Sequence, residues 1–271
     1  MEINKIYNED CIEFMTKLSN DTIDLIIADP PYNIGIDKWD NIKDYLNWSK
    51  LWITEAFRIL KPNGSLYIWG TTKNNDFIKI KLWIDEKFID YNFKNWVIWC
   101  HESMRQRTPQ DRYLHKHEDL LFYAGNKNTF NPQRDLPTEK GLSRWKGKYD
   151  ENYYIKWENM TPSMKQERKH GFYLGSVAKS WWSERLGGGK TNNGGDYRQT
   201  QNVYHSTTKT SFVSDRIVKS SSNENNLVYI PFAGSGTEIE SCINNNRNWL
   251  ATEINKEYID EIIIPRIKNI K

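Results

Sequence analysis

The chain has 271 residues and a formal net charge of +3, so it is long enough for one large core with an insertion and too weakly charged to indicate nucleic-acid binding by itself. No apolar run approaches the roughly 18 residues that a membrane span requires, and the first residues do not resemble a signal peptide. We therefore expect a cytoplasmic protein with no membrane partner. Cys11, Cys100 and Cys242 lie far apart without metal-ligand spacing, so we expect no metal site.

Short apolar runs alternate with amphipathic stretches along most of the chain. The runs predict strands at residues 5–7, 25–28, 65–69, 96–100, 120–123, 227–230 and 249–253. Apolar positions recur every three or four residues at 11–18, 42–60 and 258–267, which predicts helices. This alternation predicts an α/β fold with one inserted module.

The segment Asp29-Pro30-Pro31-Tyr32 directly follows the apolar run at residues 23–28. At the end of a buried strand, these residues can form a socket for a planar amino group. The Asp29 carboxylate can accept one N–H of an exocyclic amine and the Pro30 carbonyl the other, which favours a more nucleophilic nitrogen. Tyr32 can stack on the base that carries the amine. The alternative is an ordinary capped turn after a strand, so a second motif must decide.

The middle of the chain differs in charge from both ends. Residues 131–220 hold 16 Lys and Arg against 9 Asp and Glu, a net charge of +7 that leaves −4 for the remainder. In residues 131–203 the strand-helix alternation fades, and aromatic residues are interleaved with basic and amide residues. This pattern is typical of an insertion that contacts phosphates and reads bases, although a lysine-rich solvated surface is the alternative. The candidate contact residues are Arg144, Lys146, Lys148, Arg168, Lys169, Lys190 and Arg198.

The second motif is a glycine-rich turn after the strand at 227–230, formed by Pro231, Phe232, Ala233, Gly234, Ser235, Gly236 and Thr237. A strand, a glycine-rich turn and a helix let the backbone approach a nucleoside cofactor at the carboxyl edge of a sheet. The dinucleotide pattern GxGxxG fails, because Ile239 stands at its third glycine. The next strand ends at Glu253, whose carboxylate can accept both ribose hydroxyls, unless it is a solvated surface acid.

In their order along the chain, these motifs resemble those of the beta-class DNA amino-methyltransferases. That family uses S-adenosylmethionine to methylate adenine N6 or cytosine N4. The resemblance covers most of residues 3–130 and 204–271. Residues 8–11 resemble the short acidic motif of the family, residues 117–118 its later catalytic motif, and residues 205–210 its HPxxKP element.

The resemblance implies a Rossmann-like, seven-stranded, mostly parallel sheet of the class I methyltransferase type. A catalytic and cofactor-binding domain is expected at 1–130 and 204–271, with an inserted target-recognition region at 131–203. The expected catalytic residues are Asp29, Pro30, Pro31 and Tyr32. The expected S-adenosylmethionine-binding residues are Asp10, Cys11, Asp29, His205, Lys209, residues 231–237 and Glu253.

The implied reaction is direct methyl transfer to a base that has been flipped out of duplex DNA. Adenine is favoured over cytosine, because the Asp-initial form of the socket usually accompanies adenine in this family. The alternatives are a cytosine-N4 enzyme, an RNA adenine methyltransferase and a non-catalytic DNA-binding subunit. The resemblance also allows two further partners, a cognate restriction endonuclease and a second copy of the chain.

Two parts of the sequence depart from the family pattern. Ile230 stands where the family usually has an Asp that faces the methionine end of the cofactor, and Glu238 can supply a substitute carboxylate. In the HPxxKP element, Ser206 and Thr210 replace both prolines, whereas Lys209 is retained.

Overall fold

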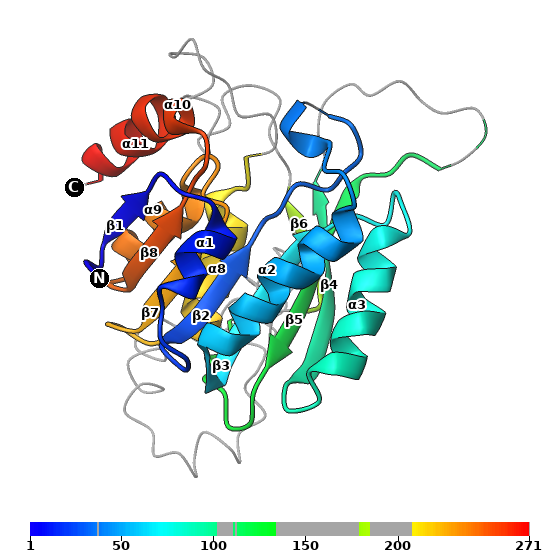
Figure 1. Cartoon of the computed structure of the whole chain (residues 1–271), viewed down its shortest axis with the longest axis horizontal. Helices are drawn as coiled ribbons and strands as arrows, with labels where there is room; N and C mark the ends of the chain where they lie inside the picture. Colours follow the sequence, from blue (N-terminus) through cyan, green and yellow to red (C-terminus); the bar gives the residue numbers. More distant parts are fainter. Residues whose placement is uncertain (37, 102–110, 112, 134–178, 185–207, 271) are drawn as a thin grey trace, which may run out of the picture. The chain divides into compact units, whose positions relative to one another are not determined.

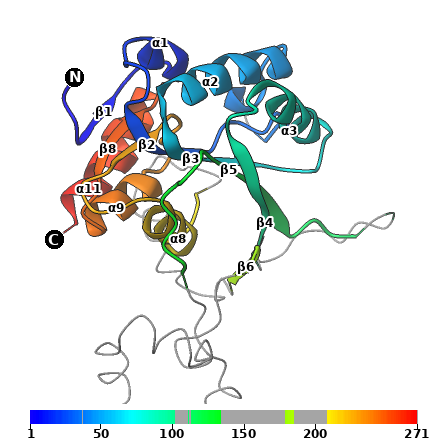
Figure 2. The ribbon, with the colours of Figure 1, turned by 90° about the horizontal axis from the view of Figure 1, so that it is seen from below.

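The computed structural model describes residues 1–36, 38–101, 111, 113–133, 179–184 and 208–270. Within these residues, helices cover both faces of one eight-stranded sheet, which Figures 1 and 2 show from two directions. The strand order is β1-β8-β7-β2-β3-β5-β4-β6, and β5 runs antiparallel to both of its neighbours. The predicted α/β fold with a mostly parallel sheet is confirmed, with one strand in addition to the seven expected.

The strands are β1 (Lys5–Tyr7), β2 (Ile23–Ala28), β3 (Leu60–Gly70), β4 (Asn92–His101), β5 (His117–Ala124), β6 (Trp181–Glu184), β7 (Leu227–Ile230) and β8 (Asn248–Thr252). The α-helices are α1 (Cys11–Thr16), α2 (Tyr45–Ile59), α3 (Asp76–Lys87), α8 (Ser211–Ser221), α9 (Thr237–Asn244), α10 (Lys256–Tyr258) and α11 (Ile264–Lys268). A short 3₁₀-helix, η1 (Lys38–Asp40), precedes α2, and a π-helical turn, η2 (Ile259–Ile263), joins α10 to α11.

Strand β2 is buried on both faces of the sheet. Ile26 and Ala28 belong to a hydrophobic cluster with α1, α2 and α3, whereas Leu25 and Ile27 belong to a second cluster with α8 and α9. Figure 2 shows these two groups of helices on opposite sides of the sheet. Successive strand residues point to opposite faces, so a strand between two helical layers must be apolar on both. The nearly continuous apolar run at 23–28 follows from this position.

The carboxyl ends of β2, β7 and β8 meet at one edge of the sheet. The three strands are parallel neighbours, and Leu25 of β2 pairs with Val228 of β7. The residues that follow these strands are Asp29, Pro231 and Glu253. Because β5 runs the opposite way, its first residues return to the same edge. The fold therefore brings together the two motifs that lie far apart in the sequence.

Residues Met1–Asn131 and Ser180–Lys271 form one compact unit, and Pro132–Lys179 form a second. Strand β6, which lies inside the predicted insertion at 131–203, pairs in parallel with β4 of the main sheet. The seven basic residues expected to contact DNA lie outside the described residues, and so does His205. Their roles stay predictions. Among the described helices, none combines the length and apolar character needed to cross a membrane.

Candidate active site

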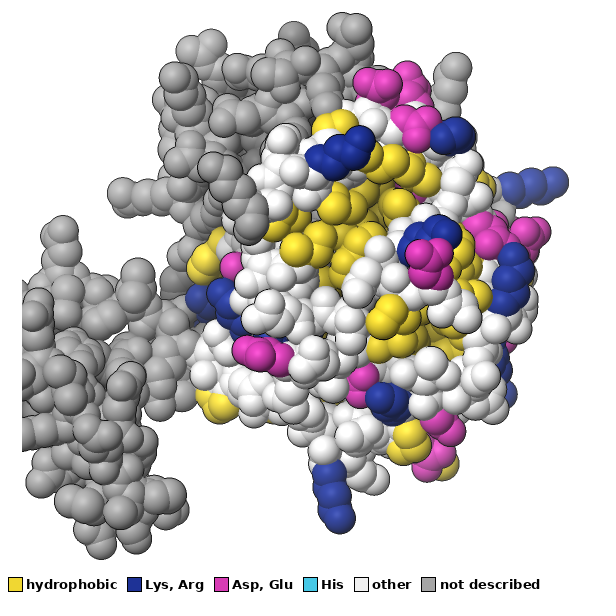
Figure 3. Space-filling view, turned by 90° about the vertical axis from the view of Figure 1, so that its left-hand side faces the viewer, with side chains coloured by type: hydrophobic (Ala, Val, Ile, Leu, Met, Phe, Trp, Pro, Cys, Tyr) yellow, Lys and Arg dark blue, Asp and Glu magenta, His cyan; other side chains and the backbone are white. Residues whose placement is uncertain are grey.

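A cavity of about 380 Å³ lies at the carboxyl edge of the sheet. Its size falls within the roughly 300–1,000 Å³ that is usual for small-molecule sites. On the face seen in Figure 3, hydrophobic side chains gather in a hollow bordered by acidic and basic side chains. Of the residues predicted from the sequence, the cavity is lined by Asp10, Cys11, Asp29, Pro30, Pro31, Tyr32, Lys209, Pro231, Phe232, Ala233, Gly234, Ser235 and Glu253.

Four polar side chains form a network at one end of this cavity. The Lys209 ammonium donates to Asp29 Oδ2 at 2.7 Å and lies 3.0 Å from Glu118 Oε2. The Tyr32 hydroxyl oxygen lies 2.9 Å from Asp29 Oδ1 and 2.8 Å from Glu118 Oε2. The single hydroxyl hydrogen of Tyr32 can be donated to one carboxylate at a time. Together these contacts fix the orientation of the Asp29 carboxylate.

The charges of this network support one another. Burial opposes the charge on Lys209, but the Asp29 and Glu118 carboxylates outweigh burial and raise the pKa of the ammonium above its usual value. Burial also raises the pKa of Asp29, and Lys209 opposes that rise. Burial and both carboxylates raise the pKa of Tyr32 well above its usual value, so Tyr32 remains a hydrogen-bond donor. The buried cation is therefore what allows a buried Asp29 to carry charge.

Asp29 keeps acceptor capacity toward the cavity. A carboxylate offers about four lone-pair sites, and the contacts with Tyr32 and Lys209 occupy one on each oxygen. The neighbouring Pro30 lines the same cavity. The predicted use of Asp29 and Pro30 as acceptors for the two N–H groups of a planar amine stays a prediction, and this geometry leaves room for it.

The chain that leaves the socket is held by Asp40, which is 1% exposed. Its carboxylate accepts hydrogen bonds from the backbone N–H groups of Asn33, Ile34 and Ile36 at 2.7, 3.0 and 3.1 Å. The Tyr45 hydroxyl donates to the Pro31 carbonyl at 2.7 Å. These bonds fix the backbone on both sides of Tyr32. The role of Asp40 could not be predicted from the sequence, because a single acid in a loop belongs to no local pattern.

The other end of the cavity is formed by the glycine-rich turn and Glu253. Gly234 and Gly236 adopt positive φ angles of 50° and 77°, which glycine tolerates without strain. The Gly234 N–H donates to Glu253 Oε2 at 2.9 Å, and the Asn255 N–H donates to Glu253 Oε1 at 2.9 Å. Burial raises the pKa of Glu253, and these backbone donors oppose the rise. Each carboxylate oxygen retains a lone pair for a hydroxyl donor, which fits a ribose.

Aromatic side chains form the wall between the two ends. Phe232 packs against Trp48 and Trp52 with ring centroids 5.8 and 5.4 Å apart. Phe232 and Trp48 both line the cavity. Asp10 accepts the backbone N–H of Ile12 at 2.8 Å as the N-cap of α1, and it also lines the cavity. Apolar walls with a few placed polar groups are typical of sites for nucleoside ligands.

The structure places two predicted cofactor residues away from the open cavity. Gly236 caps α9 and Thr237 is its first residue, and neither lines the cavity. Lys209 lines it but bonds to Asp29 of the socket. Glu118, which the sequence analysis placed in a motif without assigning a role, completes the same network. Its position at the start of the antiparallel strand β5 brings it back to this edge.

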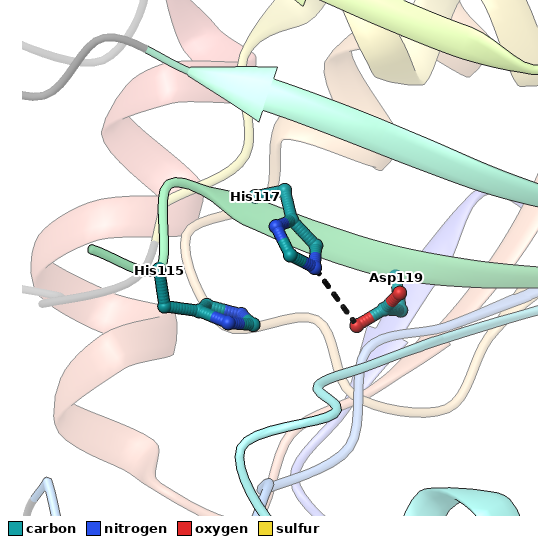
Figure 4. A group of neighbouring side chains, drawn as sticks. All are labelled: His115, His117 and Asp119. Atoms are coloured by element: carbon teal, nitrogen blue, oxygen red, sulfur yellow. Dashed lines mark ion pairs between the residues drawn. The ribbon is translucent and has the colours of Figure 1, made fainter. Parts of the chain in front are cut away.

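Three residues of types that commonly bind metal ions, His115, His117 and Asp119, lie close together at the start of β5 (Figure 4). Their ligand atoms lie within 4.8 Å of one another, and His117 Nε2 is 3.9 Å from Asp119 Oδ2. The Asp119 carboxylate, however, already accepts the Thr72 N–H at 2.9 Å, the Thr72 hydroxyl at 3.0 Å and the Trp96 Nε1–H at 2.8 Å. Anchoring the turn after β3 therefore explains Asp119 without a metal ion.

Residues 23–264 match the family described as DNA methylase. The chain belongs to the N6/N4 DNA methylase family. The match spans the socket, the network around Asp29 and the glycine-rich turn.

Two relatives show the extent of the similarity. The type II methyltransferase M.HpaI of Haemophilus parainfluenzae is 30% identical over 259 residues, which are 92% of this chain and 69% of that protein. The DNA adenine methyltransferase YhdJ of Escherichia coli (strain K12) is 29% identical over 266 residues, which are 95% of this chain and 81% of that protein. The predicted membership of the DNA amino-methyltransferases is thus confirmed.

Solved structures confirm the fold of the methylase. The PvuII DNA methyltransferase, described as cytosine-N4-specific, aligns with a TM-score of 0.68 at 13% identity over 100% of this chain and 89% of that chain. The M1.HpyAVI-SAM complex aligns with a TM-score of 0.58 at 20% identity over 97% of this chain and 98% of that chain.

Proposed function

We propose that this methylase transfers a methyl group from S-adenosylmethionine to the exocyclic N6 of adenine at specific sites in duplex DNA. The observation that carries the proposal is the single cavity whose two ends have different chemistry. One end offers the oriented carboxylate of Asp29, and the other offers Glu253 and the glycine-rich turn. An amine acceptor and a nucleoside-bearing donor therefore meet in one place.

The residues present fit the cofactor. Glu253 would hold the ribose hydroxyls with its free lone pairs, and Phe232 would provide an aromatic wall for the adenosine portion. Gly234 and Ser235 bring backbone close to the cavity. Asp10 contacts the cofactor adenine, as the family resemblance implies. When bound, the cofactor supplies an electrophilic methyl group on a positively charged sulfur.

Asp29 acts on the amine of the target base. Its carboxylate accepts one N–H and the Pro30 carbonyl accepts the other, so the nitrogen lone pair turns toward the methyl group. As the nitrogen accepts the methyl group, positive charge would develop on it, and the negative charge of Asp29 would stabilise that charge. The nitrogen would then give one proton to the Asp29 carboxylate to which it is hydrogen-bonded, and Asp29 would release this proton to solvent. Lys209 and Glu118 position Asp29 through the network, and no covalent enzyme intermediate is required.

The substrate assignment rests on chemistry and on relatives. The amine of a stacked base cannot reach the cavity, so the target nucleotide must leave the duplex, at a cost of a few kcal/mol. Tyr32 lines the cavity and offers the flipped base an aromatic face. Adenine is favoured by the Asp-initial form of the socket and by the similarity to a DNA adenine methyltransferase. Site recognition falls to residues 131–203. A companion endonuclease and a homodimer stay predictions.

Transfer of labelled methyl from S-adenosylmethionine to unmethylated bacterial DNA tests the proposal, with nucleoside digestion to identify the product and mapping of the modified positions. We expect N6-methyladenine within one short sequence motif. Detection of N4-methylcytosine instead would mean that the target base is cytosine and would leave the mechanism unchanged. Transfer to RNA but not to duplex DNA would contradict the proposed substrate, and a lack of transfer to either would contradict the enzymatic assignment.

A further inference from the structure

Glu238 is a buried carboxylate that faces the cavity. It lies in the first turn of α9, is 6% exposed and lines the cavity wall. The Ser214 hydroxyl donates to its Oε1 at 3.0 Å. Among the residues that the structure describes, no Lys or Arg lies within ion-pair distance of Glu238. Burying a carboxylate without a cation is costly, so this arrangement favours a ligand that brings positive charge.

Glu238 lines the same cavity as Asp29 and Lys209, and the charges of both act on it. Burial raises the pKa of Glu238 most, the Asp29 carboxylate raises it further, and Lys209 opposes both effects. Lys209 is already shared by Asp29 and Glu118 at 2.7 and 3.0 Å. Glu238 therefore has a neutral hydroxyl as its hydrogen-bond partner, and no described Lys or Arg forms an ion pair with it.

The same neighbourhood lacks the acid that the family resemblance implies at the end of β7. Ile230 occupies that position, is 1% exposed and belongs to the hydrophobic cluster on the α8 and α9 side of the sheet. It does not line the cavity. Glu238, in the first turn of α9, can take the place of the acid that is absent from the end of β7. The helix dipole also favours negative charge at this position.

We propose that Glu238 binds the cationic methionine end of S-adenosylmethionine, in place of the acid that Ile230 replaces. The inference rests on the proposed function. With its adenosine end at Glu253, the cofactor would extend its sulfonium and ammonium groups toward Asp29, and Glu238 lines this part of the cavity without an ion-pair partner among the described residues. The exchange of positions makes Glu238 a residue that helps to bind the cofactor.

Isothermal titration calorimetry of the purified protein tests this inference without an activity readout. The two ligands are S-adenosylmethionine and 5′-methylthioadenosine, which shares the adenosine portion but lacks the charged methionine end. We expect Glu238→Gln to weaken S-adenosylmethionine binding about tenfold or more and to leave 5′-methylthioadenosine binding within about twofold, a tenfold loss being about 1.4 kcal/mol.

Glu240→Gln is the matched control, because Glu240 lies on the same helix, pairs with Arg266 at 2.6 Å and does not line the cavity. It should bind both ligands like the wild type.

A double variant, Ile230→Asp with Glu238→Thr, returns the acid to the strand end and should recover affinity for S-adenosylmethionine relative to Glu238→Thr alone.

The outcomes separate the two proposals. Wild-type protein that fails to bind S-adenosylmethionine would contradict the proposed function itself. Wild-type binding with an unchanged affinity in Glu238→Gln would overturn only the role of Glu238. Equal weakening of both ligands in Glu238→Gln would also overturn it, because the side chain would then support the whole cavity and not the charged end.

Discussion

Asp29 is held between a buried cation and a partly buried phenol, and this environment defines its chemistry. Lys209 and Tyr32 bond to different oxygens of the carboxylate, and Glu118 contacts both of these partners. The carboxylate is therefore oriented before any substrate binds. Preorganised charge of this kind stabilises a transition state without reorganisation during the reaction.

Replacing Asp29 by Ala should abolish methyl transfer and leave cofactor binding largely intact, because the proposed cofactor contacts of Glu253 and the glycine-rich turn lie at the other end of the cavity. Loss of one oriented polar group in an active site costs roughly 100-fold to 1,000-fold in rate. Single-turnover transfer and calorimetric titration measure the two properties separately. Asp90→Ala, at an exposed turn, is the control and should retain full rate. A fully active Asp29→Ala protein would refute the role of Asp29.

Replacing Lys209 by Met should reduce both stability and transfer. Lys209 is 3% exposed, and its loss leaves two partly buried carboxylates without a cation. Removing one partner of a buried ion pair costs about 3–5 kcal/mol of unfolding free energy. Urea unfolding should show this loss, with partial recovery in Lys209→Met combined with Glu118→Gln. The exposed Lys43→Met serves as the control, and equal stability of Lys209→Met and this control would contradict the network.

The role of Lys209 shows what the sequence could not reveal at the residue scale. The family resemblance placed Lys209 in an element assigned to the cofactor, whereas its ammonium bonds to Asp29. That pairing joins residues 180 positions apart, and no local pattern encodes it. Asp29 and Glu253, in contrast, directly follow strands, so their position at the sheet edge could be predicted from the order of strands alone.

At the scale of elements, the buried strands were predictable and several helices were not. Helix α3 buries Phe77, Ile80 and Ile84, but Ile78 and Leu82 are 40% and 57% exposed. The resulting alternation of apolar and polar residues hides the helical period. Helix α8 is hidden for another reason, because three of its six buried residues are serines. Strand β6 is short and lies within the basic segment, where the strand pattern is weak.

The loop after the socket is an element whose conformation depends on one side chain. Asp40→Ala removes the acceptor of three backbone N–H groups and should destabilise the protein by about 1–3 kcal/mol while raising KM for DNA. Asp40→Asn keeps one carbonyl oxygen and should fall between Asp40→Ala and the wild type. Chemical unfolding and steady-state kinetics measure the effects. The exposed Asp44→Ala is the control, and identical KM values for Asp40→Ala and this control would contradict the anchoring role.

At the scale of the molecule, the sheet brings together the socket and the glycine-rich turn, which lie far apart in the sequence. The parallel neighbours β2, β7 and β8 end at one edge, and the antiparallel β5 begins there. The cavity at this edge contains the socket at one end and the glycine-rich turn at the other. Fold class and the convergence of these motifs could be predicted from the sequence, because they follow from strand order. The size and walls of the cavity depend on packing across the layers and could not.

Cofactor binding to this edge should stabilise the whole unit, since the residues proposed to contact S-adenosylmethionine follow several different strands. At a concentration 100 times its Kd, a ligand that binds only the folded state adds about 2.7 kcal/mol. This gain corresponds to a rise in Tm of roughly 5–10 °C. Thermal unfolding with and without S-adenosylmethionine measures it. 5′-Methylthioadenosine should give a smaller shift at the same concentration, and equal shifts would contradict a contribution from the methionine end.

The most direct test of the central claim is the identity of the modified nucleoside in duplex DNA after incubation with S-adenosylmethionine and either the wild-type protein or Asp29→Ala. The account predicts N6-methyladenine with the wild-type protein and none with the variant. A wild-type protein that binds S-adenosylmethionine but leaves both adenine and cytosine unmodified would contradict the account, and so would an Asp29→Ala protein that methylates DNA at the wild-type rate.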